Sequence, residues 1–130
     1  MLVLPELFLP DDNLPDIAEH AQPMDGGRMA DLSSAARQVG CALTVGFAER
    51  AGERVYDSAV TLSVHGLAIA HHRKIQLCGP REAGVFCPGD QVVAFDFQGR
   101  RAALVIVDLP APLAEGLRST HMTDYRPAEM

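Results

Sequence analysis

Three charged side chains interrupt or follow apolar segments of the chain: Glu6, Lys74 and Glu82. Glu6 lies between MLVLP and LFL, and a partly buried carboxylate at such a place is suited to act as a general base. Lys74 ends the charged run HHRK, and an ammonium at a strand end can stabilise an oxyanion. Glu82 lies in GPREAGVFCPGD, whose prolines and glycines can hold a loop rigid. The simpler interpretation of each is an ordinary solvent-exposed charge.

Histidine and cysteine side chains offer a second kind of chemistry, a metal site. The candidates are His65, His71, His72, Cys78 and Cys87. Their spacing matches no common zinc pattern such as CxxC or HxxxH, and the adjacent histidines would point to opposite faces of a strand. The sequence therefore predicts no metal and no cofactor.

The strands that must position these residues are indicated by apolar, β-rich segments. We expect strands at residues 1–4, 41–48, 56–64, 67–71, 91–97 and 101–108. Tight turns at His65-Gly66 and Gln98-Gly99 would join four of them into two hairpins. The pattern predicts a layered α/β (α+β) domain built around one extended sheet.

Helical signals are fewer. Apolar residues recur at helical spacing from residue 28 to residue 39, and Gly40 follows where a C-terminal cap belongs. Residues 10–27 are predicted to form a loop with one helical turn near residues 16–21, and residues 78–90 a loop without a helix. A short helix is expected at residues 111–119.

Composition limits the classes of partner. The chain has 130 residues, enough for one domain, and a net charge of −6 with a pI near 5.2. An acidic chain argues against nucleic acid or an anionic membrane as a partner, and no apolar window is long enough to span a bilayer. Three cysteines are an odd and sparse set, which favours reduced thiols and a cytoplasmic protein.

Several segments together resemble the carbon–nitrogen hydrolase family, also called the nitrilase superfamily. The likeness is carried by LVLPELFL at 2–9, VGFAER at 45–50, VYDSAV at 55–60, HGLAIAHHRKIQLCGPREAGVFCPGD at 65–90 and GRRAALVIVD at 99–108. It implies a partial α-β-β-α sandwich over residues 1–119. Residues 120–130 show no periodicity and are expected to form an unstructured tail.

The resemblance also implies a Glu-Lys-Cys catalytic set. Glu6 matches the general base, Lys74 the oxyanion-stabilising lysine, and Glu82 a second glutamate that positions substrate and nucleophile. Such a set hydrolyses a non-peptide C–N bond of a small amide or nitrile. A thiolate attacks the carbon, and water then hydrolyses the thioester.

The chain departs from the family pattern at the nucleophile. Val107 is the best match to the catalytic cysteine, and valine cannot attack a carbonyl. Cys78 and Cys87 occupy loop positions and are poor substitutes. Gln76 stands where many members have His, and Asp57 where they have Asn.

About half of the usual domain is also expected to be missing, which would leave apolar sheet faces uncovered. Three hypotheses follow: an amidase-like or nitrilase-like hydrolase inactive as written, a non-catalytic pseudoenzyme fragment, or a product without function. The fragment would self-associate as a homo-oligomer or pair with a full-length relative.

Overall fold

The computed structural model describes residues 1–10 and 14–108. Its strands are β1 (Leu2–Val3), β2 (Leu43–Ala51), β3 (Arg54–Leu62), β4 (Ala68–Arg73), β5 (Val93–Phe97) and β6 (Arg100–Leu104). Its helices are a 3-10 turn, η1 (Ile17–His20), and the α-helices α1 (Gly27–Val39) and α2 (Gly79–Ala83). The helix expected at 111–119 and the tail expected at 120–130 lie outside the described residues.

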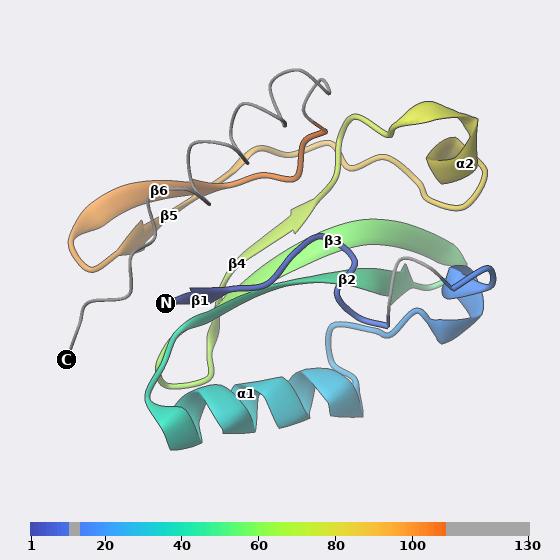
Figure 1. The fold of residues 1–130 in the computed structure, drawn as a ribbon. Helices are drawn as coiled ribbons and strands as arrows, with labels where there is room; N and C mark the ends of the chain where they lie inside the picture. Colours follow the sequence, from blue (N-terminus) through green and yellow to red (C-terminus); the bar gives the residue numbers. More distant parts are fainter. Residues whose placement is uncertain (11–13, 109–130) are drawn as a thin grey trace, which may run out of the picture.

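The strands form two sheets (Figure 1). The larger sheet has the order β1-β2-β3-β4, with β1 parallel to β2 and the other neighbours antiparallel. The second sheet is the β5-β6 hairpin. The expectation of a single extended sheet is therefore wrong. The reason is that the segment after β4 turns back across the larger sheet, so the hairpin packs on its face instead of extending its edge.

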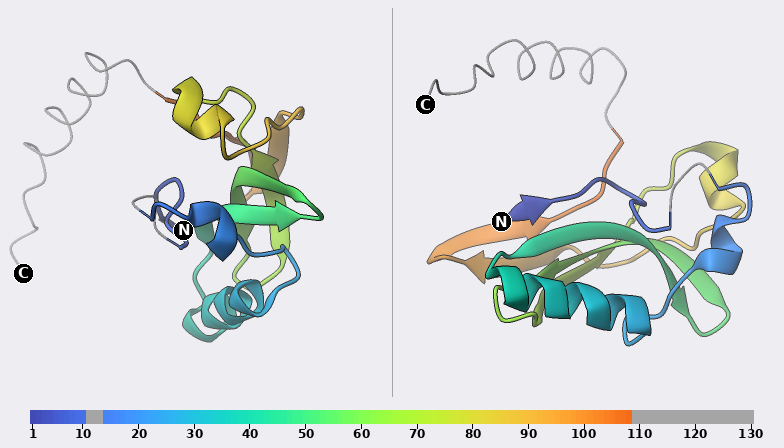
Figure 2. Two further views of the ribbon diagram at one scale, coloured as in Figure 1. Left: turned by 90° about the vertical axis from the view of Figure 1, so that its right-hand side faces the viewer. Right: turned by 60° about the horizontal axis from the view of Figure 1, so that its bottom comes forward.

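Each face of the larger sheet is covered by a different element (Figures 1 and 2). Side chains alternate between the faces along a strand. Val45, Phe47 and Val60 pack against Met29 and Ala36 of α1 on the face that we call the helix face. On the other face, which we call the hairpin face, Ala59 and Ala70 pack against Phe95, Leu104 and Ile106.

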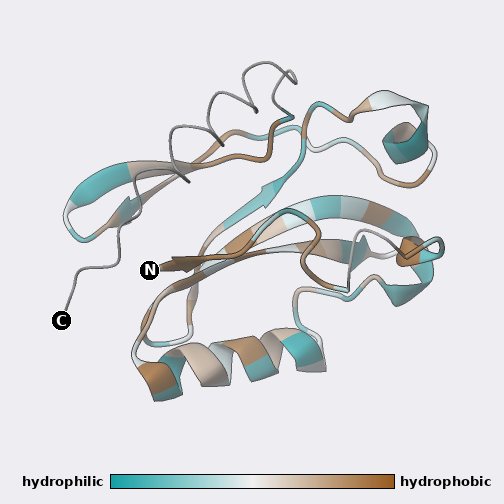
Figure 3. Cartoon of the chain, in the orientation of Figure 1, coloured by the Kyte–Doolittle hydropathy of each residue, from teal (hydrophilic) through white to brown (hydrophobic). Residues whose placement is uncertain are grey.

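Helix α1 matches its prediction within one residue. Met29, Leu32 and Ala36 recur at three and four positions and form one buried or half-buried stripe, and hydrophobic and hydrophilic residues alternate along the helix (Figure 3). Gly40 ends it in the left-handed region, with φ of 66°, which glycine adopts without a Cβ penalty. In the described residues, no helix is long and apolar enough to cross a membrane.

Gly46 lets the segment after β1 lie directly on strand β2. A Cβ at Gly46 would fall 2.5 Å from the Pro5 carbonyl oxygen and 2.7 Å from the Glu6 Cα. Leu7, the next residue, has φ of 48°, which is uncommon for a residue other than glycine. The close approach and the tight backbone place Glu6 over the hairpin face of the sheet.

A cluster of polar side chains around the buried Glu49 carboxylate occupies the helix face, at the end of the sheet away from the residues that pack against α1. Glu49 accepts hydrogen bonds from Ser58 Oγ at 2.6 Å, His71 Nε2 at 2.8 Å and Arg73 Nη2 at 2.6 Å. The Arg73 guanidinium also lies 4.0 Å from the centre of the Tyr56 ring. Burial alone would raise the pKa of Glu49, but the bonds from His71, Arg73 and Ser58 outweigh burial and lower it to about 2.

We expect Glu49→Gln to lower the free energy of unfolding by about 3 kcal/mol at neutral pH, because Arg73 would lose its buried counter-charge. The folded pKa lies below the ordinary value of 4.5, so this stabilisation is present above pH 4.5 and is lost as the pH falls towards 2. In urea unfolding, the difference in unfolding free energy between wild type and Glu49→Gln should therefore be less than half as large at about pH 3 as at neutral pH. Glu53→Gln, in the exposed β2–β3 turn, is the control. Equal effects of the two substitutions would contradict the prediction.

Candidate active site

Lys74 follows directly after β4, and the strand pairing fixes its direction. His71 and Arg73 contact Glu49 on the helix face, so His72 and Lys74 point to the hairpin face. The Lys74 N–H donates to the Asp57 carbonyl at 2.8 Å, and its own carbonyl accepts from Gly89 N–H at 2.8 Å. Because a Cβ on Gly89 would overlap the Arg73 backbone, glycine is needed for this contact.

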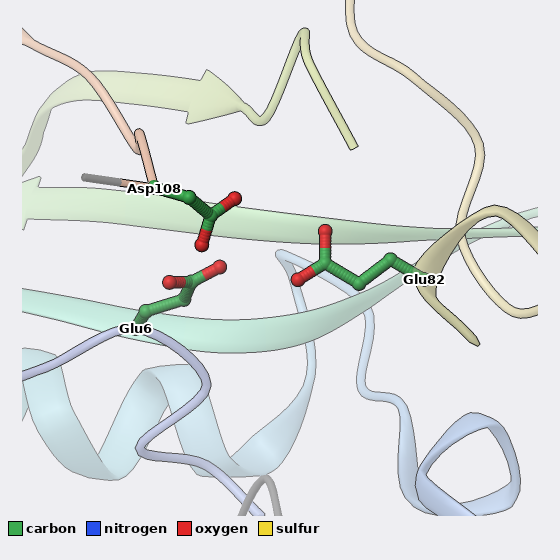
Figure 4. Close-up of side chains that lie close together, drawn as sticks. All are labelled: Glu6, Glu82 and Asp108. Carbon is green, nitrogen blue, oxygen red and sulfur yellow. The ribbon is translucent and has the colours of Figure 1, made fainter. Parts of the chain in front are cut away.

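The Lys74 side chain is fully buried and surrounded by carboxylates. Its Nζ lies 2.7 Å from Glu6, 2.8 Å from Asp108 and 3.0 Å from Glu82. Figure 4 shows these three carboxylates converging from separate parts of the chain. An ammonium has three N–H donors, so each acidic side chain takes one of them. The interpretation of Lys74 as an ordinary exposed lysine is therefore wrong.

Electrostatics keep Lys74 charged. Burial by itself would lower its pKa, but hydrogen bonds to Asp108, Glu6 and Glu82 outweigh burial and raise the pKa above its usual range. Lys74 is also the one lysine in the 130-residue sequence. The chain thus places its single ammonium side chain in its interior.

Glu6 and Glu82 reach Lys74 from segments that precede and follow it in the sequence. Glu6 follows β1 and Pro5, and its side chain is about one-third exposed. Glu82 belongs to α2, a helical turn that the sequence analysis expected to be loop, and its second oxygen accepts Cys78 N–H at 2.7 Å. The structure brings together Glu6, Lys74 and Glu82, which are the three charged residues that sequence reasoning selected.

Two further carboxylates at this site were not selected from the sequence. Asp108 is the acid that directly follows the apolar segment LVIV, and that position was the available signal. Asp57 lies on β3, fully buried, with an oxygen 3.8 Å from Lys74 Nζ. From the sequence, Asp57 stood out only as an Asp where many members of the family have Asn, because the fold alone shows which face it occupies.

Val107, the residue at the predicted nucleophile position, precedes Asp108 and is more than half exposed. It lines a cavity of about 320 Å³ together with Cys78 and Asp108. A neighbouring cavity of about 440 Å³ is lined by Glu6, Glu82 and Asp108 on its polar side and by Leu7 and Phe86 on its apolar side. The acidic side chains therefore face a space large enough for a small ligand.

The oxygens of Glu6, Glu82 and Asp108 lie within 4.8 Å of one another, as the ligands of a cation do. The Lys74 ammonium already binds all three of them. We therefore assign this position to the ammonium. The histidines considered above are placed apart, with His71 bonded to Glu49 and His72 buried on the opposite face.

Comparison with known proteins identifies the family. The carbon-nitrogen hydrolase family model matches residues 1–109. An (R)-stereoselective amidase from Pseudomonas sp. is 34% identical over 114 residues, which cover 85% of this chain and 41% of that amidase. The NitN amidase of Nesterenkonia sp. AN1 superposes with a TM-score of 0.67 at 28% identity, covering 80% of this chain and 42% of that one.

A cysteine-to-alanine mutant of the Nesterenkonia amidase, in complex with butyramide, superposes with a TM-score of 0.59 at 28% identity. It shares 70% of this chain and 34% of its own. The present chain thus spans less than half the length of the relatives that it matches. The family match covers most of the sequence, and the solved amidases share its fold: this chain belongs to the carbon–nitrogen hydrolase family.

Proposed function

We propose that this chain is an amidase-like member of its family whose site is built for a small amide or nitrile but does not turn it over as written. The observation that carries the proposal is the buried Lys74 ammonium held between Glu6 and Glu82. In the reaction that the family resemblance implies, Glu6 is the base, Lys74 stabilises the oxyanion, and Glu82 positions the reacting groups.

Two features argue against turnover. The first is Val107, which offers no nucleophile at the position where the resemblance expects a thiol. The second is Asp108, whose carboxylate takes the third N–H donor of Lys74 at 2.8 Å. An oxyanion needs a donor aimed at it, and all three donors of this ammonium are already bound to carboxylates.

The alternative is a non-catalytic interaction module that pairs with itself or with a full-length relative. The observation that favours it is an apolar groove of about 240 Å³ lined by Val3, Leu4, Val105 and Val107 among others. Val3, Val105 and Val107 are each more than half exposed. Apolar β1 lies at the edge of the larger sheet, and none of the described strands pairs with its outer edge, next to this groove (Figure 3).

A cytoplasmic location is part of the same proposal. It is supported by the free thiols of Cys41, Cys78 and Cys87.

We expect Val107→Cys alone to release no ammonia from butyramide above the wild-type background, because Asp108 still occupies the lysine donor and the groove beside residue 107 stays open. The matched control is Val105→Cys, an equally exposed residue two positions earlier on the same segment. Ammonia release by the first variant and not by the second would show that a nucleophile is all that the site lacks.

We expect Asp108→Ala to bind butyramide about tenfold more tightly than wild type, because one charged N–H donor of Lys74 becomes available to the amide oxygen. Saturation-transfer NMR titrations measure both affinities. Asp96→Ala removes a carboxylate from the exposed β5-β6 hairpin and should change nothing. Unchanged affinity after Asp108→Ala would contradict an amide site at Lys74.

Sedimentation velocity tests the interaction module. The alternative predicts a dimer or larger species in wild type, and Val105→Glu with Val107→Glu should shift it to monomer by placing charges in the apolar groove. A wild-type protein that is monomeric at every concentration would contradict self-association and would favour the hydrolase-derived site.

A further inference from the structure

Asp57 is a buried ionisable side chain that the proposed chemistry does not use. It lies in the middle of the larger sheet, between Ala48 on β2 and Lys74 at the end of β4. It has no exposed surface, and among the described residues no N–H or O–H donates to either of its carboxylate oxygens. A buried carboxylate without a donor is costly, so its state needs an explanation.

Lys74 does not supply the missing donor. Its Nζ is 3.8 Å from the nearer Asp57 oxygen, beyond hydrogen-bond distance, and its three donors are bound to Glu6, Glu82 and Asp108. His72, two residues earlier on β4, has both ring nitrogens buried and unpartnered, and burial lowers its pKa. It therefore brings no positive charge to Asp57.

The remaining neighbour is the Glu6 carboxylate, whose hydrogen bonding and negative charge both act to raise the pKa of Asp57. Two carboxyl groups can form a hydrogen bond only if one of them carries a proton. Asp57 is the more buried of the two, since the Glu6 side chain is about one-third exposed. The proton therefore belongs on Asp57.

The charge balance leads to the same conclusion. Glu6, Glu82 and Asp108 already place three negative charges around one ammonium. An ionised Asp57 would add a fourth negative charge at a point without solvent exposure and without a donor among the described residues, which is strongly unfavourable. A proton on Asp57 removes that charge. It also supplies an O–H donor, from which the Glu6 oxygen can accept a hydrogen bond.

We propose that Asp57 is held in the folded protein as a neutral carboxylic acid, whose O–H donates a hydrogen bond to Glu6 and so positions Glu6 against Lys74. Asp57 is thus a positioning residue and a site of proton uptake on folding. This inference goes beyond the proposed function, because it holds whether or not the chain acts on an amide.

The consequence is a stability that falls as the pH rises. Burial, together with hydrogen bonding to and repulsion by Glu6, raises the pKa of Asp57 from 3.8 to about 9. Between these values the unfolded chain releases the proton while the folded chain retains it. Each pH unit in that range therefore costs up to about tenfold in the folding equilibrium constant.

Asp57→Asn tests this directly, because the amide is nearly isosteric and can donate to Glu6 without titrating. Urea unfolding should show a variant-to-wild-type ratio of folding constants that rises by up to about tenfold per pH unit from about pH 5 to about pH 8. The control, Asp96→Asn, changes an exposed carboxylate and should give a flat ratio. If Asp57 were an ionised partner of Lys74, Asp57→Asn would instead be less stable at neutral pH, and its ratio would not rise.

A second measurement does not need the variant to fold. Because Lys74 is the one lysine of the chain, ¹³C-lysine labelling gives a single Cε–Hε cross-peak that lies beside Asp57. In wild type this peak should shift with a midpoint near pH 9, the pKa of Asp57. The shift should persist in Asp96→Asn. A peak that does not move between about pH 7 and about pH 10 would overturn the proposal.

Discussion

The burial of the Lys74 ammonium is the constraint on which the rest of the structure depends. Removing an ammonium from water costs several kcal/mol, and only well-placed carboxylates can offset that cost. Glu6, Glu82 and Asp108 supply them from three separate parts of the chain. The segment after β1, helix α2 and the end of the hairpin segment are thus tied to one point above the larger sheet.

Strand β4 carries two charged clusters on its two faces. Arg73 binds Glu49 on the helix face, and Lys74, the next residue, binds the other carboxylates on the hairpin face. Adjacent residues can serve opposite faces because a strand turns successive side chains by half a turn. A displacement of β4 would break both clusters, so the strand end is fixed from both sides.

The residues of this site differ in what their loss would leave behind. Valine at the exposed position 107 leaves no buried charge, whereas removing Lys74 or one of its carboxylates would leave its partners unpaired. The charged part of the site therefore contributes to folding. Asp108 accepts the N–H of Lys74 that an oxyanion would need, so Lys74 has a structural role in this site.

Sequence patterns were sufficient for the local elements and for part of the site. Helix α1 and its Gly40 cap, the hairpin turns at residues 65–66 and 98–99, and the choice of Glu6, Lys74 and Glu82 all followed from spacing, turn residues and family likeness. Helix α2 was not expected, because a five-residue helix beginning at a Gly-Pro pair is too short to show periodicity.

Tertiary structure decided what depended on pairs distant along the chain. Residues 6, 57, 74 and 108 meet only after the sheet forms and the hairpin folds over its face. The burial of Lys74, the burial of Asp57 and the cluster around Glu49 are therefore absent from any local pattern. The sequence by itself determined the elements and the family, whereas the proton and charge balance of the site was decided by packing, because burial and charge pairing are properties of neighbours in space.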